Sequence, residues 1–418
     1  MNLKIRLIVM SFLQFFVWGA WLITIGNYWF GNQIGSPPEF GKIFMTLGIA
    51  SIVMPTLTGI IADKWMNAER LYGMLHIFSG LVIMFIPQIS NPTTFFWVML
   101  LAMLFYMPTI SLSNSVAYTI LKSNNFDVIK VFPPIRVWGT IGFIAAMWAV
   151  NLTGNKASGN MFYISAAASF ILGFYSFTLP KCVPQRLINK DASVTEKLGL
   201  NAFRLFGKYK MALFFLFSML LGAALQLTNM YGDRYVDNFK EIPEYANLFV
   251  VKYSTIIMSI SQISETLFIL AIPFFLKRFG IKNVMLISMV AWVLRFGLLA
   301  YGNPADGLWM IVVSCIVYGM AFDFFNVSGS LFVESTTDSK IRSSAQGLFM
   351  MMSNGFGAIM GSFGSGYIIE QFFTNADKSW DWRGIWICFA IYSAVIALLF
   401  AILFKHKHNP KEVESFSH

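Results

Sequence analysis

The sequence predicts an all-α membrane protein of twelve transmembrane helices arranged as two six-helix bundles. Of its 418 residues, 57% are hydrophobic and only 12% are charged, about half of the roughly 25% that soluble domains carry. Twelve apolar windows are each long enough to cross ~30 Å of hydrocarbon, which takes about 20 residues of helix. The longest polar connection follows the sixth window, near the middle of the chain. Collagenous, disordered and disulfide-stapled proteins are excluded.

The windows place the predicted helices in order along the chain. The first six cover residues 7–30, 40–62, 71–89, 93–121, 135–152 and 161–179. The second six cover residues 211–231, 253–276, 284–301, 308–327, 345–369 and 385–404. The predicted domains are an N-terminal six-helix bundle over 1–180, a cytoplasmic middle loop over 181–210, a C-terminal six-helix bundle over 211–404 and a cytoplasmic tail over 405–418.

Lysine and arginine residues are concentrated on one side of the predicted membrane. With the N-terminus inside, the basic residues left outside are Lys42, Lys156, Arg234, Lys240, Lys252, Lys378 and Arg383. The positive-inside rule therefore places both termini in the cytoplasm. This topology accounts for the net charge of +10, so we expect the lipid bilayer as a partner and no nucleic acid.

The two halves share a weak internal similarity. Residues 135–143 and 341–349 open the fifth and eleventh spans with Ile, Arg and Phe at matching positions. Two halves of six spans joined by a basic loop are the layout of the major facilitator transporters.

Polar side chains inside the spans fall into stripes, because helical residues three or four apart share a face. The stripes are Arg136, Thr140 and Phe143; Gln226 and Asn229; Gln262 and Glu265; and Phe322 or Asp323 with Asn326. Polar groups in a bilayer are costly, so those retained usually face a cavity and have a function.

This set of side chains suits a neutral, hydroxyl-rich ligand with a flat ring. Amides and a carboxylate bind vicinal hydroxyls, and Phe143 or Phe322 stacks on the ring. The alternative for each amide is an interhelical hydrogen bond, which we favour for Gln14, Gln346 and Asn354. Either Glu265 or Asp323 could carry a coupling proton, and the sequence does not choose between them.

Arg295 is an exception in an otherwise apolar ninth span. Its side chain could pair with a neighbouring carboxylate or extend to a membrane interface.

Signals of an enzyme are missing from the sequence. The four histidines are His76, His406, His408 and His418, and the three cysteines lie far apart. Neither a metal cluster nor a His-based catalytic triad can form from them, and no Walker or Rossmann glycine run is present. We therefore expect no enzyme activity, no catalytic residues, no metal and no cofactor.

Six segments together resemble the bacterial nucleoside:proton symporters of the major facilitator superfamily. They are SFLQF at 11–15 with Trp18 and Trp21 after it, GIIADKW at 59–65, FPPIR at 132–136, SISQISE at 259–265, YGMAFDFFN at 318–326 and SSAQG at 343–347. The resemblance runs from Met1 to the tail after Phe404, and the FPPIR and FDFFN runs are its specific part.

The resemblance implies nucleoside uptake across the bacterial inner membrane, driven by the proton gradient through alternating access. The positions that match the family's substrate pocket are Arg136, Thr140, Phe143, Gln226, Asn229, Gln262, Glu265, Tyr318, Phe322 and Asp323. Tyr318 enters this set through the resemblance alone. Asp323 or Glu265 is expected to take the proton, which is the coupling ion, and the chain is expected to act as a monomer.

Two other functions compete with this interpretation. A proton-coupled sugar or glycoside permease of the same fold would also bind hydroxyls, and the ring-stacking Phe pair distinguishes the nucleoside. A non-transporting nucleoside sensor would bind the ligand without accumulating it.

Overall fold

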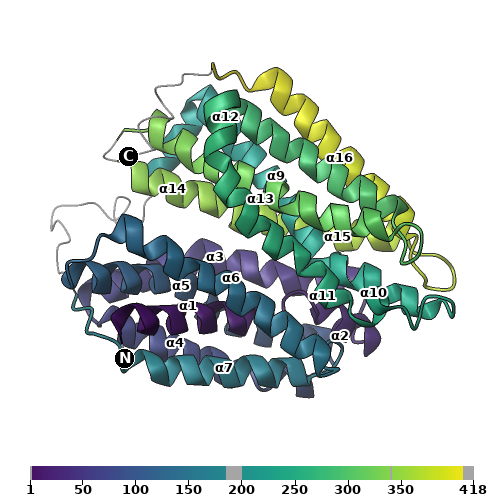
Figure 1. The fold of residues 1–418 in the computed structure, drawn as a ribbon, viewed down its shortest axis with the longest axis horizontal. Coiled ribbons are helices and arrows are strands. Elements are labelled where there is room, and N and C mark those ends of the chain that lie inside the picture. Colours follow the sequence, from purple (N-terminus) through teal and green to yellow (C-terminus); the bar gives the residue numbers. More distant parts are fainter. Residues whose placement is uncertain (1, 185–199, 339–340, 408–418) are drawn as a thin grey trace. The chain divides into compact units, whose positions relative to one another are not determined.

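The computed structural model describes residues 2–184, 200–338 and 341–407, and these are almost entirely helical (Figure 1). The one β contact among them is an isolated bridge between Thr374 and Trp380. The prediction of an all-α chain is confirmed. Much of the predicted middle loop and most of the tail lie outside the described residues.

In the first half, residues 2–184 form seven α-helices. They are α1 (Leu3–Gly19), α2 (Ile25–Gly31), α3 (Pro37–Lys64), α4 (Ala68–Ile83), α5 (Pro92–Ser123), α6 (Val128–Leu152) and α7 (Asn160–Ser176). The start of α3 shows how local sequence sets a boundary. Ser36 and Glu39 form a capping box, in which the Ser36 backbone N–H donates to Glu39 Oε2 at 2.8 Å. Pro37 occupies the first helical turn, where backbone N–H groups have no partner within the helix, so the N–H that proline lacks is not missed.

Over the described residues 200–338 and 341–407, the second half forms eight α-helices and a π-helical stretch. They are α9 (Tyr209–Asn238), α10 (Phe249–Lys252), α11 (Ser254–Met258), α12 (Ile260–Tyr301), α13 (Leu308–Thr336), α14 (Arg342–Met350), the π-helix Met351–Gly357, α15 (Ala358–Phe372) and α16 (Trp382–Leu403).

Eight helical segments of the described residues are long and apolar enough to cross a membrane, against twelve predicted spans. The difference arises where a predicted span is broken, short or fused to its neighbour. The first span is divided into α1 and α2, the sixth is the short α7, and the eleventh is divided by the π-helix. Helix α12 contains both the eighth and the ninth span. Each predicted span thus coincides with helix in the structure.

The first predicted span, 7–30, is wrong as one continuous helix. The Trp21 N–H bonds to the Trp18 carbonyl at 3.3 Å instead of continuing the α ladder. The Val17 carbonyl that it would have used accepts a hydrogen bond from Ser165 Oγ of α7 at 2.7 Å. A side chain inserted into the backbone ladder breaks a helix in this way.

Gly280 makes the bend between the two spans in α12. Its φ of 75° and ψ of 167° are not helical. A positive φ is strained for residues that carry a Cβ atom, whereas glycine adopts it readily. The sequence places this turn correctly, between residues 276 and 284.

The contacts of the chain divide it into two compact units. The first contains Met1–Ala192 with Asn229–Arg234, and the second contains Ser193–Thr228 with Tyr235–His418. In the first unit α1 packs on α6 and α7, α3 on α5, and α4 on α5 and α7. In the second unit α12 packs on α13 and α16. The exact domain boundaries at 180, 210 and 404 stay a prediction.

A buried network of neutral polar groups joins helices of the first unit. Gln14 of α1 donates through Nε2 to Thr109 Oγ1 of α5 at 2.9 Å. Its Oε1 accepts from the Tyr72 hydroxyl at 2.6 Å and from His76 Nε2 at 2.9 Å, and His76 Nδ1 lies 3.2 Å from Ser169 Oγ of α7. The interhelical hydrogen bond favoured for Gln14 is confirmed. This network also shows that the third and sixth spans carry buried polar contacts.

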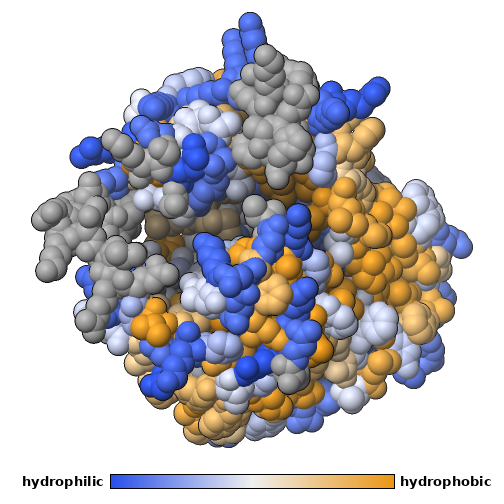
Figure 2. All heavy atoms as spheres, turned by 60° about the vertical axis from the view of Figure 1, so that its left-hand side comes forward, coloured by the Kyte–Doolittle hydropathy of each residue, from blue (hydrophilic) through white to orange (hydrophobic). Residues whose placement is uncertain are grey.

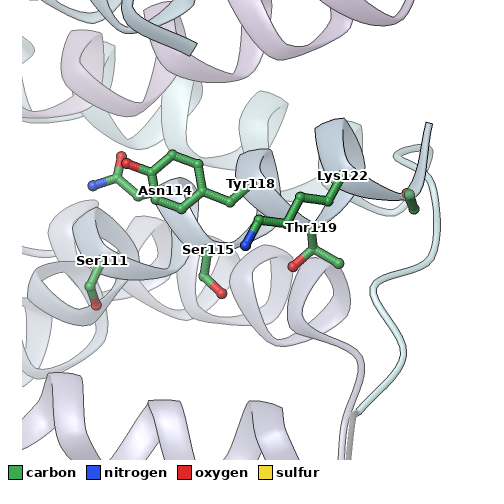
Figure 3. A pocket seen from close by; sticks show the side chains of 7 residues that line it. Ser111, Asn114, Ser115, Tyr118, Thr119 and Lys122 are labelled. Carbon is green, nitrogen blue, oxygen red and sulfur yellow. The ribbon is translucent and has the colours of Figure 1, made fainter. Parts of the chain in front are cut away.

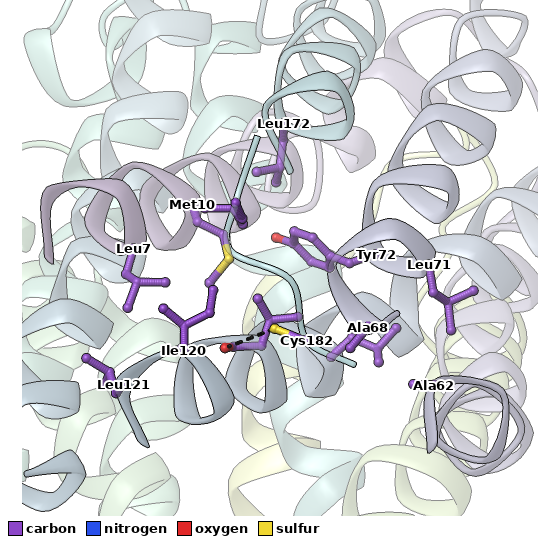
Figure 4. Close-up of a cluster of buried hydrophobic side chains, with 14 of the residues drawn as sticks. Leu7, Met10, Ala62, Ala68, Leu71, Tyr72, Ile120, Leu121, Leu172 and Cys182 are labelled. Atoms are coloured by element: carbon purple, nitrogen blue, oxygen red, sulfur yellow. Dashed lines mark hydrogen bonds between the residues drawn. The ribbon is translucent and has the colours of Figure 1, made fainter. Parts of the chain in front are cut away.

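A hydrophobic cluster fills the first unit near the end of α7 (Figure 4). Cys182, which follows α7, is 3% exposed within it. Its backbone N–H donates to Glu69 Oε2 of α4 at 2.8 Å, and its carbonyl accepts from the Ala68 N–H at 3.2 Å. These bonds hold the segment after α7 against the start of α4.

Large hydrophobic side chains are exposed on the outer faces of several helices. Among them are Leu267, Leu270 and Phe274 on α12 and Leu398 and Ile402 on α16. Figure 2 shows hydrophobic surface running over one flank of the molecule. A surface of this kind is suited to contact with lipid.

Candidate functional site

The first group of predicted site residues lies on one face of α6. Arg136, Thr140 and Phe143 follow each other at helical spacing, and α1 packs against this helix. The Arg136 guanidinium lies 4.1 Å from the centre of the Phe15 ring, a cation–π contact. The Phe143 ring meets the Trp18 ring edge-on at 6.3 Å. The face therefore offers a cation, a hydroxyl and aromatic rings.

The close packing of α1 on α6 depends on glycine. A Cβ atom on Gly142 would collide with the Phe12 backbone, and one on Gly19 would lie 2.5 Å from the Phe143 carbonyl oxygen. The two backbones approach closely because neither glycine carries a side chain.

The second group comes from α9, α12 and α13, and its rings and carboxylates lie where α12 meets α13. Tyr318 and Phe322 stack with nearly parallel rings, whose centroids are 6.0 Å apart and whose interplanar angle is 3°. Tyr318 interacts electrostatically with both Glu265 and Asp323, and these two carboxylates also interact with each other. Asp323 is only 5% exposed. Two acidic side chains thus lie beside a pair of aromatic rings.

Three oxygen atoms of this second group are buried without a hydrogen-bond partner among the described residues. They are Oε1 of Gln226, Oε1 of Gln262 and Oδ2 of Asp323. Leaving a buried polar atom unpaired costs about 1–3 kcal/mol, so such atoms are rare in a structure. All three are acceptor atoms by their chemistry, which suits a ligand that presents O–H or N–H donors.

Helix α9 supplies two predicted residues at helical spacing, Gln226 and Asn229. Gln226 is 7% exposed, whereas Asn229 is half-buried. Asn229 begins the short segment of α9 that groups with the first unit, so the ten predicted residues divide between the two units.

Two of the cavities lined by described residues lie next to these groups, and the second of the two includes Phe322 in its lining. One, of about 630 Å³, lies along α5 and is lined by Ser111, Asn114, Ser115, Tyr118, Thr119, Lys122 and Ser123 (Figure 3). Its Tyr118 interacts electrostatically with Arg136, so this polar cavity begins near the first group. The other, of about 410 Å³, is lined in part by Phe322, Asn326 and Gln346.

Sequence reasoning did not place several neighbours at the site. Trp292 meets the Tyr318 ring edge-on at 5.9 Å, and the Arg295 guanidinium lies 4.6 Å from the centre of the same ring. Their spacing of three residues on α12 could have indicated a shared face. In the first unit, Phe15 and Trp18 lie within a quoted motif, but no periodicity distinguished them from core residues.

The arrangement can bind a polar ligand and carry a proton, and it offers little for covalent chemistry. Among the described residues, no group of histidine, cysteine, aspartate and glutamate side chains could hold a metal ion. Acceptor oxygens, aromatic rings and a carboxylate pair are the features of a binding site.

Fold and site define a helical membrane transporter. A bacterial homologue of the human lysosomal transporter Spinster has the same fold, with a TM-score of 0.67 at 12% identity over 99% of this chain and 97% of that one. The fold class, a helical membrane protein of the major facilitator type, is confirmed. The chain belongs to the nucleoside H+ symporter family, whose model matches residues 1–409.

Similar proteins cover the whole chain. The xanthosine permease of Escherichia coli K12 is 49% identical over 99% of both chains, and the nucleoside permease NupG of the same strain is 49% identical over the full length of both. The crystal structure of nucleoside transporter NupG matches with a TM-score of 0.90 over 97% of this chain and 100% of that one. The family resemblance read from the sequence is confirmed, and these relatives are permeases.

Proposed function

We propose that this protein takes up nucleosides together with protons across the bacterial inner membrane by alternating access. The observation that carries the proposal is the set of unpartnered acceptors, Gln226 Oε1, Gln262 Oε1 and Asp323 Oδ2, together with the stacked Tyr318 and Phe322 rings. A nucleoside matches it because ribose hydroxyls donate hydrogen bonds and the base is a flat ring.

The proposed ligand contacts extend to all ten predicted residues. Phe143 stacks on the base, and Arg136 and Thr140 add polar contacts from α6. Asn229, Gln262 and Glu265 bind polar groups of the nucleoside. Membership of a nucleoside H+ symporter family and the similarity to two permeases support this assignment.

The coupling proton is proposed to bind Asp323 or Glu265. These carboxylates interact with each other, and charged groups inside a membrane are costly unless they are paired or neutralised. One proton taken up by the pair lowers this cost. Release of that proton to the cytoplasm then accompanies release of the nucleoside.

The membrane orientation follows from the charge distribution. We propose that both termini lie in the cytoplasm, since most lysines and arginines then fall on the inner side. The protein acts as a monomeric transporter and not as an enzyme, with the proton as its coupling ion and no other cofactor.

Uptake into proteoliposomes tests the proposal. Radiolabelled uridine, adenosine and xanthosine are offered with an imposed pH gradient, with and without a protonophore. Accumulation that the protonophore abolishes is the expected result. Binding without accumulation would favour a sensor, and uptake of a sugar or glycoside but no nucleoside would overturn the substrate assignment.

A further inference from the structure

Arg295 is a charged side chain in the interior of the second unit. It is 0% exposed and ranks among the largest fully buried side chains of the described residues. It lies in the second arm of α12, within the predicted ninth span. A guanidinium in a membrane interior is costly and is usually retained for a function. Because the side chain is enclosed by protein, extension to a membrane interface is ruled out.

Arg295 hydrogen-bonds to neutral oxygens on three helical segments, and it also interacts with the Cys315 side chain. Nη1 donates to the Ser314 carbonyl at 2.7 Å and lies 3.5 Å from Ser261 Oγ, and Nε donates to Thr228 Oγ1 at 3.2 Å. Nη2 has no hydrogen-bond partner among the described residues. None of these acceptors is a carboxylate, so these bonds do not show the carboxylate pairing that the sequence suggested.

The partners of Arg295 belong to three helical segments that carry predicted site residues. Thr228 lies on α9 directly before Asn229, and Ser261 lies on the first arm of α12 directly before Gln262. Ser314 lies on α13, one turn before Tyr318. One side chain thus contacts all three segments that supply the second group.

The guanidinium also supports an aromatic ring of that group. It lies 4.6 Å from the centre of the Tyr318 ring, and Trp292 on the same face of α12 meets this ring edge-on at 5.9 Å. Tyr318 in turn stacks on Phe322 with an interplanar angle of 3°. The orientation of both rings therefore depends on contacts from α12.

We propose that Arg295 is a positioning residue of the nucleoside site. Its planar guanidinium holds the Tyr318 ring, and through it Phe322, in the orientation that receives the base, and Arg295 does not contact the ligand. Arginine suits this role because a planar, charged group stacks on an aromatic face and donates several hydrogen bonds in fixed directions. The inference rests on the proposed nucleoside function.

A double-mutant cycle tests whether Arg295 acts through the ring. Uridine binding to the purified, full-length protein is measured by calorimetry for Arg295→Met and Arg295→Lys, alone and combined with Tyr318→Phe or Tyr318→Leu. We expect Arg295→Met to weaken uridine binding about tenfold in the wild-type background and in the Tyr318→Phe background, which keeps the ring. In the Tyr318→Leu background, which removes the ring, the same change should weaken binding by less than about twofold, because the effects of residues in contact are non-additive. Arg295→Lys keeps the charge without the planar group and is expected to weaken binding too.

The matched control is Arg278→Lys, on the same helix, where the guanidinium lies beside the Phe279 ring at 5.8 Å and is exposed. It is expected to leave uridine affinity unchanged. In transport assays the Arg295 variants should raise KM more than they lower kcat, which a general loss of folded protein would not do. If Arg295→Met does not fold, Thr228→Val provides the test, because it removes the Thr228 hydroxyl that accepts from Arg295 Nε. Loss of this one neutral acceptor should weaken uridine binding about two- to threefold.

Three results would overturn the inference. The first is an unchanged uridine affinity in the folded Arg295 variants. The second is a loss of affinity on Arg295→Met that is as large in the Tyr318→Leu background as in the wild-type background. The third is a lower melting temperature of the Arg295 variants with normal uridine affinity. In each case wild-type binding of uridine keeps the proposed function. A wild-type protein that binds no nucleoside would instead refute that function, and the positioning role with it.

Discussion

Gly319 of α13 packs directly on the backbone of Ser264 in α12: a Cβ atom added to Gly319 would lie 2.5 Å from the Ser264 carbonyl carbon. This approach brings Tyr318 and Phe322 to the helix that carries Glu265. The carboxylate pair and the ring pair are close together because Gly319, at the contact of the two helices, has no side chain.

Gly319→Ala is therefore expected to push α13 away from α12. Overpacking of this kind costs about 1–3 kcal/mol, and we expect a lower melting temperature of the detergent-solubilised protein together with weaker nucleoside binding. Gly297→Ala, on α12, is the control, since a Cβ there would meet nothing within 4 Å. Equal melting temperatures for wild type and Gly319→Ala would contradict the close packing.

Gln226→Leu separates a ligand-binding amide from a structural one. Because Gln226 Oε1 has no partner among the described residues, its loss should leave stability unchanged and lower nucleoside affinity about tenfold, which corresponds to about 1.4 kcal/mol. Gln346→Leu is the matched control. Its amide exchanges hydrogen bonds with Ser330 at 3.1 and 2.7 Å, so its loss should lower the melting temperature and spare affinity. The reverse pattern in calorimetry and thermal unfolding would refute both assignments.

Asp323→Asn and Glu265→Gln test the coupling proton. At least one of them should abolish nucleoside accumulation against a gradient and keep exchange of nucleoside across the membrane, because a carboxamide binds polar groups but does not carry the proton. Asp377→Asn is the control. This exposed carboxylate has its pKa lowered by hydrogen bonds from Ser379, so it stays charged at neutral pH. Wild-type accumulation in both Asp323→Asn and Glu265→Gln would refute the assignment of the coupling proton to these carboxylates.

The Cys182 thiol should react slowly with maleimide between pH 7 and 9. Burial raises its pKa to about 12, and the nearby Glu69 carboxylate adds to the rise. Since the thiolate is the reactive form, the rate should stay low until the pH nears that value. The measurement uses a Cys315→Ser, Cys388→Ser background. Val183→Cys with Cys182→Ser is the matched control, because residue 183 is 65% exposed and should label quickly.

Removing the Glu69 contact should release this segment. Glu69→Leu eliminates the acceptor of the Cys182 N–H, and faster labelling of Cys182 is expected at constant pH. An unchanged rate would show that the hydrophobic cluster alone protects the thiol.

The positions of the helices could be read from the sequence because hydrophobic length is a direct requirement of the membrane. Even the bend at Gly280 falls where the charged residues Lys277 and Arg278 interrupt the apolar run. The break after Gly19 could not be read, because its cause is Ser165, a residue distant in sequence that takes the Val17 carbonyl.

The candidate site was predicted in part. Helical spacing picked out Gln226, Gln262 and Asp323, and these hold the unpartnered oxygens. Spacing also separated Gln226, which shares a helix face with Asn229, from Gln346, whose amide bonds to Ser330, but it could not show that the Gln226 oxygen lacks a partner. The role of Arg295 was hidden because its partners are a hydroxyl on α9 and a carbonyl on α13, which no charge pattern reveals.

The π-helix Met351–Gly357 affects whether the eleventh span tolerates the deletion of one residue. A π turn holds one residue more than an α turn, whereas deleting a residue from a regular α-helix rotates all that follows by about 100°. A single deletion within this stretch would convert it to α-helix and keep α14 and α15 in register. The same deletion between Tyr318 and Phe322 in α13 would rotate Phe322 and Asp323 together, away from the face that carries Tyr318. A length variant is thus accommodated in the eleventh span and excluded from the tenth.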